Sequence, residues 1–155
     1  MILSGGLSNC LVQESSDPPL DPTDPNDIRL PTYLIPDTYI VRLRPVLTGS
    51  DPSQFHFFGT VRILFNVTQS TDVITIHTKN LTVNEESVLV NSPTDGPVEV
   101  KGYSVDPARE FLNVQLNGSL SRQDLVSIYL EFSGPIKPDL AGIYYSSYDM
   151  DGETK

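Results

Sequence analysis

Apolar and polar residues alternate along most of the chain from residue 28 onward, as expected for strands with one buried face. In residues 57–67 the odd positions are apolar or glycine, while the even positions include Thr60 and Asn66. Residues 125–132 repeat this design. Shorter stretches of the same kind cover residues 39–43, 73–77, 87–90, 98–100 and 111–116.

Turn-forming residues separate these stretches, and no segment sustains the spacing of three and four that an amphipathic helix needs. The pattern predicts an all-β fold of roughly six to nine strands, arranged as an antiparallel sandwich or a saddle-like sheet. The expected turns lie at Thr48-Gly49, Asp95-Gly96-Pro97, Asn117-Gly118 and Gly134-Pro135.

The N-terminal part has a different composition. Residues 15–27 read SSDPPLDPTDPND, in which prolines alternate with aspartates, and such a sequence favours an extended, solvated chain. A calcium site built from these aspartates is disfavoured, because calcium loops need a glycine turn and a fixed order of oxygens. We therefore expect residues 1–27 to be a disordered linker or stalk, and residues 28–155 to form the β domain.

The composition and net charge argue against several classes of function and of structure. The chain has 155 residues, enough for one domain, with 10 basic and 20 acidic residues and a net charge of −10. This charge argues against nucleic-acid binding and against anionic membrane surfaces. A single cysteine, Cys10, excludes an internal disulfide and a thiolate metal cluster. No apolar run approaches the roughly 20 residues of a transmembrane helix.

The sequence offers few residues for catalysis. His56 and His77 lie far apart, and neither has a second histidine or glutamate at helical spacing. Cys10 has no nearby base, and no nucleophile elbow or phosphate-binding glycine loop is present. Residues 149–152, Asp-Met-Asp-Gly, resemble the start of a calcium loop, but a hairpin turn is the better interpretation. We predict no catalytic, cofactor-binding or metal-binding residue in this chain.

Three Asn-x-Ser/Thr motifs are candidates for glycosylation. Their acceptors are Asn66, Asn80 and Asn117. By strand alternation Asn66 points away from Phe65, and Asn117 is expected in an exposed turn. These motifs favour a secreted chain or one on the extracellular face of the plasma membrane, although the N-terminus lacks a good signal peptide.

A series of motifs resembles the N-terminal domain of the M1 family of zinc aminopeptidases, in particular the aminopeptidase N type. The series runs in order from residue 28 to the end of the chain. It comprises Arg29-Leu-Pro31 with Pro36, Tyr39, Leu43 and Pro45; Phe58-Gly59 with Val61 and Ile63; Thr71 with Ile74 and Ile76-His77; Leu81 with Val83; Leu130 with Phe132 and Gly134; and Leu140 with Gly142-Ile-Tyr144, Ser146 and Tyr148.

The resemblance implies that this chain is a non-catalytic domain of a zinc aminopeptidase. In the family, a catalytic domain with a His-Glu-x-x-His helix binds zinc and removes N-terminal residues from peptides. Those motifs, and the segments that bind the free amine of the peptide, would follow Lys155. The expected cofactor is therefore zinc in the full-length parent, with none bound by this chain. The expected partners are the parent's catalytic domain and, through it, peptide substrates.

The two chain ends fit this resemblance. The Asp151-Gly152 dipeptide is typical of a hairpin reversal, and no returning strand is expected after it. Upstream, the acidic stretch occupies the place of the stalk in membrane-anchored members, so membrane attachment would depend on segments that this chain lacks. We interpret the chain as a domain truncated before the catalytic part, with a cleft-closing role. The alternative is a free-standing, secreted β-sandwich that binds a protein or glycan.

Overall fold

The computed structural model describes residues 24–48, 51–139, 142–150 and 153–154. These residues form strands and one 3-10 turn, with no α-helix among them. The elements in chain order are β1 (Leu34–Val46), η1 (Pro52–Gln54), β2 (His56–Val67), β3 (Thr71–His77), β4 (Thr82–Ser92), β5 (Gly96–Val98), β6 (Val100–Asp106), β7 (Phe111–Leu120), β8 (Leu125–Pro135), β9 (Asp149–Met150) and β10 (Glu153–Thr154).

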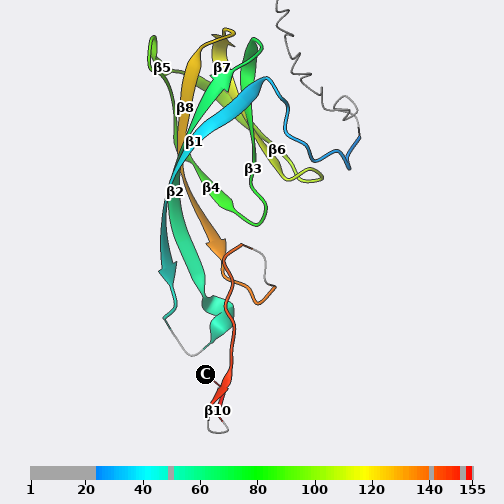
Figure 1. Ribbon diagram of the computed structural model, residues 1–155, viewed down its shortest axis with the longest axis vertical. Helices are drawn as coiled ribbons and strands as arrows, with labels where there is room; N and C mark the ends of the chain where they lie inside the picture. The colour runs from blue at the N-terminus through cyan, green and yellow to red at the C-terminus, as the bar shows by residue number, and fades with distance from the viewer. Residues whose placement is uncertain (1–23, 49–50, 140–141, 151–152, 155) are drawn as a thin grey trace, which may run out of the picture.

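Two antiparallel sheets face each other (Figure 1). The larger has the order β1-β2-β8-β4-β5, and the smaller has the order β3-β7-β6. The predicted all-β antiparallel sandwich is confirmed, with eight strands in these two sheets. In Figure 1 the lower parts of β1, β2 and β8 extend past the smaller sheet, so only part of the larger sheet is covered.

The core lies between the two sheets. Alternate residues of β2 and β8 point inward, among them Phe65 and Ile128, and they meet Ile74 of β3 and Val114 of β7. Ile74, Val114 and Ile128 are completely buried. Burial of each such side chain stabilises the fold by about 1.5–3 kcal/mol, so this apolar layer supplies the main driving force for folding.

Two of the expected turns are instead parts of strands. Asn117-Gly118 lies within β7, where the β3 register jumps from Gln115 to Leu120 and Gly118 adopts a φ of 142°. Gly134-Pro135 ends β8 and pairs with β2. Both predictions were wrong because glycine also serves within strands, at bulges and at close contacts between strands.

The expected strand at residues 98–100 is divided between the two sheets. β5 ends at Val98 in the larger sheet and β6 begins at Val100 in the smaller one, so the chain changes sheets at Glu99. The backbone oxygen of Glu99 accepts a hydrogen bond from the backbone N–H of Asn117, 2.8 Å away. The alternation of apolar and polar residues did not predict this change of sheet, because such a pattern describes a single strand and not the sheet that the strand joins.

The chain end also differs from expectation. A returning strand is present: Glu153 pairs with Met150, and Thr154 pairs with Asp149, in a short antiparallel ladder. Residues 151–152 themselves lie outside the described residues. Most of the predicted linker, residues 1–23, also lies outside them. Its last residues, Asp24 to Asp27, form a turn in which the backbone N–H of Asp27 donates to the oxygen of Asp24.

Candidate functional site

An apolar groove lies between the two sheets. It has a volume of about 440 Å³ and is lined by residues of β1, β2, β3, β4 and β8, together with the segments before β1 and after β3. Residues 30–36 and residues 75–78 contribute to its lining. Its apolar lining includes Val41, Val61, Ile63, Phe65, Leu130 and Phe132.

The inner face of β1 stays accessible along this groove. Tyr39, Val41 and Leu43 point the same way as the core residues of β2, since they pair with Ile63, Val61 and Gly59. Yet they remain 57%, 50% and 46% exposed. Contiguous exposed apolar surface of this kind usually marks an interaction site. The groove is therefore a continuation of the core that lacks a covering element within the described part of the chain.

A chain of polar groups lies beside the groove. The Thr75 hydroxyl donates to Oδ1 of Asn113 at 2.8 Å, and it is 2.9 Å from the Tyr33 hydroxyl. Because the single proton of Thr75 is directed to Asn113, Tyr33 must be the donor to Thr75. This network joins the segment before β1 to β3 and β7, and it satisfies a buried threonine.

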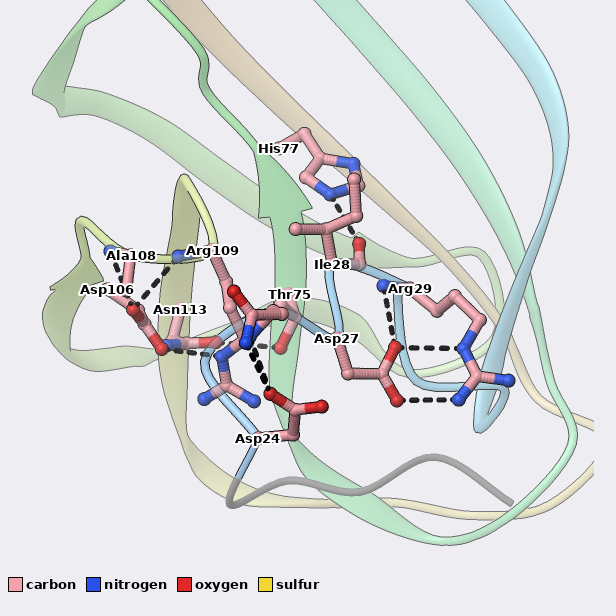
Figure 2. Close-up of polar contacts among 11 residues, drawn as sticks. Asp24, Asp27, Ile28, Arg29, Thr75, His77, Asp106, Ala108, Arg109 and Asn113 are labelled. Atoms are coloured by element: carbon pink, nitrogen blue, oxygen red, sulfur yellow. Dashed lines mark hydrogen bonds and ion pairs between the residues drawn. The ribbon is translucent and has the colours of Figure 1, made fainter. Parts of the chain in front are cut away.

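The N-terminal segment is held against the smaller sheet by further polar contacts (Figure 2). Nε2 of His77 lies 2.8 Å from the backbone oxygen of Ile28, so this nitrogen carries the proton of the bond. The His77 ring also lies 4.9 Å from the Phe111 ring, centroid to centroid. Next to it, the Arg29 guanidinium contacts the Asp27 carboxylate at 2.6 Å. His77 therefore anchors the chain that leads into β1.

A second ion pair closes the turn between β6 and β7, also shown in Figure 2. Nε of Arg109 donates to the Asp106 carboxylate at 2.7 Å, and the backbone N–H groups of Arg109 and Ala108 donate to its other oxygen. The hydrogen bond from the Arg109 side chain is the main reason that the pKa of Asp106 is lowered. This carboxylate therefore stabilises a turn, and it shows no feature of a catalytic acid.

The residues considered for catalysis do not come together. His56 lies on β2 of the larger sheet, where Nδ1 is 2.8 Å from the oxygen of Gln54, whereas His77 lies on β3 of the smaller sheet. Cys10 falls outside the described residues. Among the residues that are described, no group of three or more histidine, cysteine, aspartate or glutamate side chains could hold a metal ion.

The three glycosylation candidates are all exposed. Asn66 lies on β2, opposite to the core face, and Asn80 lies in the turn before β4 with a φ of 54°. Asn117 lies on β7, where its side-chain amide donates to Glu99 at 2.7 Å. Their exposure is compatible with glycosylation, which stays a prediction.

Sequence reasoning missed the groove, although residues 39–43 carried a signal. Tyr39, Val41 and Leu43 alternate with Ile40 and Arg42, so apolar residues occur on both faces of β1. A strand that is apolar on both faces usually needs cover on both. β1 lies at the edge of its sheet and has little cover on either face. Val41, on the side toward the core, is 50% exposed, and Ile40 on the other side is 55% exposed.

Comparison with known proteins identifies the family. The model of the peptidase M1 N-terminal domain matches residues 35–155, which is most of the chain. The chain belongs to the peptidase M1 N-terminal domain family. The resemblance seen in the motifs is thereby confirmed, and the open groove is a property of an M1 N-terminal domain.

Several full-length relatives are aminopeptidases. Aminopeptidase N of Rattus norvegicus is 34% identical over 153 residues, which cover 96% of this chain and 16% of the relative. Aminopeptidase N of Homo sapiens is 37% identical over 134 residues, covering 84% of this chain and 14% of the relative. Aminopeptidase 2 of Candida albicans is 29% identical over 126 residues, covering 81% and 12%. This M1 domain thus spans about one eighth to one sixth of the length of these relatives.

The described residues contain no helix that is long and apolar enough to cross a membrane.

Proposed function

We propose that this chain is the non-catalytic N-terminal β domain of a zinc aminopeptidase that removes N-terminal residues from peptides. In this proposal the catalytic domain covers the groove of β1 and β2, and the β domain closes one side of the active-site cleft. The observation that supports it is the half-exposed apolar row of Tyr39, Val41 and Leu43, in a chain that belongs to the M1 N-terminal domain family.

Burial of this row is energetically sufficient to support a domain contact. Apolar surface gains about 25 cal/mol for each Å² removed from water, so covering three large side chains contributes several kcal/mol. In this proposal no zinc-dependent step belongs to this chain. The metal of the parent enzyme would be held by residues of the catalytic domain. The same relationship would place the enzyme on the extracellular face of the plasma membrane or among secreted proteins.

The test is a chimera in which this chain replaces the matched segment of rat aminopeptidase N. We expect the chimera to fold and to hydrolyse an aminoacyl chromogenic substrate. Val41→Asp should sharply reduce the yield of active enzyme, because a carboxylate would be buried in the domain contact. Ile40→Asp is the matched control, since Ile40 is the adjacent residue on the opposite face.

Two results would contradict the proposal. Equal yields from the Val41→Asp and Ile40→Asp chimeras would show that the groove is not a domain contact. Zinc-dependent turnover by the 155-residue chain alone would show that the domain is itself catalytic. A chain that is stable and monomeric alone, and that cannot replace the rat segment, would favour the alternative of a free-standing binding module.

A further inference from the structure

The outer face of the larger sheet carries a cluster of arginines. Arg42 and Arg44 of β1 pair with Thr60 and Phe58 of β2, while Arg62 of β2 pairs with Ile40 and, on its other side, with Tyr129 of β8. Since paired residues share a face, all of these side chains point away from the core. We call the set Arg42, Arg44, Phe58, Arg62 and Tyr129 the arginine face.

This clustering is unusual for the composition. The chain has twice as many acidic as basic residues, yet three of its 10 basic side chains lie on this one face, and all three are exposed. The neighbouring acidic group is Glu131, whose Oε1 accepts a hydrogen bond from the Tyr129 hydroxyl at 3.3 Å. The positive charge is therefore local, within a molecule that is acidic as a whole.

Two of the three arginines, Arg44 and Arg62, stack on rings. None of the three forms an ion pair among the described residues, where ion pairs join Arg29 to Asp27, Lys79 to Glu110, and Arg109 to Asp106. The Arg44 guanidinium carbon lies 5.0 Å from the centroid of Phe58, and that of Arg62 lies 6.0 Å from the centroid of Tyr129. A guanidinium stacked on a ring still presents its N–H edge, and that edge matches a carboxylate with two parallel hydrogen bonds.

The face borders a hollow and a free strand edge. The hollow has a volume of about 420 Å³, and its lining includes Arg42, Arg44, Phe58, Tyr129 and Glu131. β1 is the first strand of its sheet and has β2 as its only neighbour in the described part of that sheet, so its other edge carries unpaired backbone groups. Such an edge accepts an extended segment as an added strand.

We propose that the arginine face and the free edge of β1 bind an extended acidic segment of a partner protein. Arg42 and Arg44 are two positions apart on a strand, so their side chains repeat at about 6.8 Å along one face. An added strand with carboxylates at alternate positions has the same repeat. Its carboxylates would pair with Arg42 and Arg44.

The negative net charge of the chain favours a short acidic strand over a large polyanion as the partner. A long phosphate polymer or an anionic membrane would interact with the whole field of a molecule of net charge −10 and would be repelled. A short acidic strand meets mainly the local arginines. The chain's own acidic stretch is a poor occupant, because its prolines lack the N–H groups that strand addition requires.

The proposal does not depend on the proposed function. The arginine side chains and the row of Tyr39, Val41 and Leu43 point to opposite faces of β1, and the peptide test measures binding to the 155-residue chain alone, with no catalytic domain present. A failure of the chimera test would therefore leave the acidic-segment proposal unchanged, and the converse also holds.

The test uses the 155-residue chain and a short fluorescent peptide in which glutamate alternates with threonine. A peptide of the same composition with its glutamates clustered at one end is the comparison. Fluorescence anisotropy should show that the alternating peptide binds at least about tenfold more tightly. Amide hydrogen exchange should show new protection in β1 when the alternating peptide is bound.

Variants locate the site. Arg42→Glu/Arg44→Glu should weaken binding of the alternating peptide by at least about tenfold. Lys101→Glu/Lys137→Glu changes the net charge equally at two exposed positions away from the face, and should leave binding almost unchanged. Arg42→Lys/Arg44→Lys keeps the charge but removes the planar donor pairs, so it should give an intermediate loss. A thermal melt of each variant checks that the fold is retained.

Three outcomes would overturn the proposal. Equal affinity for the two peptides, or an equal loss in both Glu double variants, would show unspecific charge attraction. Absence of binding to the alternating peptide would show that the arginine face does not bind extended acidic segments. Tighter binding of inorganic polyphosphate than of the peptide, lost in Arg42→Glu/Arg44→Glu, would assign the face to a phosphate polymer instead.

Discussion

Gly59 of β2 and Phe132 of β8 pair across the larger sheet so closely that a methyl group does not fit at residue 59. A Cβ built on Gly59 would lie 2.5 Å from Cζ of Phe132 and 2.8 Å from Cδ2 of Leu43. The Phe132 ring thus lies over the backbone of Gly59. Glycine at this position is required by close approach, and its φ is not in the left-handed region.

Gly59→Ala should destabilise the domain. The added methyl group must displace the Phe132 ring, which we expect to cost about 1–3 kcal/mol of the free energy of unfolding. Urea unfolding followed by circular dichroism measures the change. Gly102→Ala is the control, because no heavy atom lies within 4 Å of a Cβ at that position. Equal stability of the two variants would disprove the close contact. Phe132→Leu should partly restore the stability of Gly59→Ala.

Thr75→Val should lower the stability of the domain by interrupting the hydrogen-bonded network of Tyr33, Thr75 and Asn113. The substitution keeps the shape of the side chain but leaves the Tyr33 hydroxyl and Asn113 Oδ1 without their shared partner. We expect a loss of about 1 kcal/mol in the free energy of unfolding. Combined with Tyr33→Phe in a double-mutant cycle, the two sites should show a coupling of roughly 0.5 kcal/mol or more. Strict additivity would show that the hydroxyls do not interact.

The Asp106–Arg109 pair should make stability depend on acid pH. The pKa of Asp106 is lowered in the folded chain, mainly by the hydrogen bond from Arg109, so the folded state favours the ionised carboxylate. This contribution is complete above the pKa of the unfolded chain, near 4, and is lost as the pH falls through the lowered pKa of the folded state.

Arg109→Ala tests this linkage. The variant should be less stable than the parent chain at neutral pH, and the difference should shrink as the pH is lowered through the acid range. Urea midpoints measured from neutral pH downward give the profile. Asp51, whose pKa is lowered by the hydrogen bond from Ser53, contributes in the same direction, so Asp51→Asn should reduce the remaining acid sensitivity. A difference that stays constant with pH would contradict the role of the ion pair.

His77→Ala should loosen the segment that precedes β1. The substitution removes the hydrogen bond to the backbone oxygen of Ile28, and Arg29 next to it is exposed. Trypsin should therefore cleave after Arg29 faster in the variant than in the parent chain. His77→Gln provides the comparison, since its side-chain amide retains an N–H donor, and it should show a smaller increase. Identical cleavage rates in all three proteins would show that His77 does not hold the segment.

The amino-acid sequence alone determined the class of fold, because alternation with period two is a local property. The stretches at residues 57–67 and 125–132 became β2 and β8 with nearly the expected bounds. The motif series also identified the M1 N-terminal domain, since a family resemblance needs only the order and spacing of residues. The exposure of Asn66 followed from the same alternation, as it points away from the core.

Only the tertiary structure decided which positions meet. Asn117-Gly118 and Gly134-Pro135 have the composition of turns, but their pairing with distant strands makes them parts of β7 and β8. The groove and the arginine face depend on the smaller sheet stopping short of β1, and on β1 lying at the edge of the larger sheet. These features arise from contacts between residues far apart in the chain, and a local pattern of apolar and polar residues does not contain them.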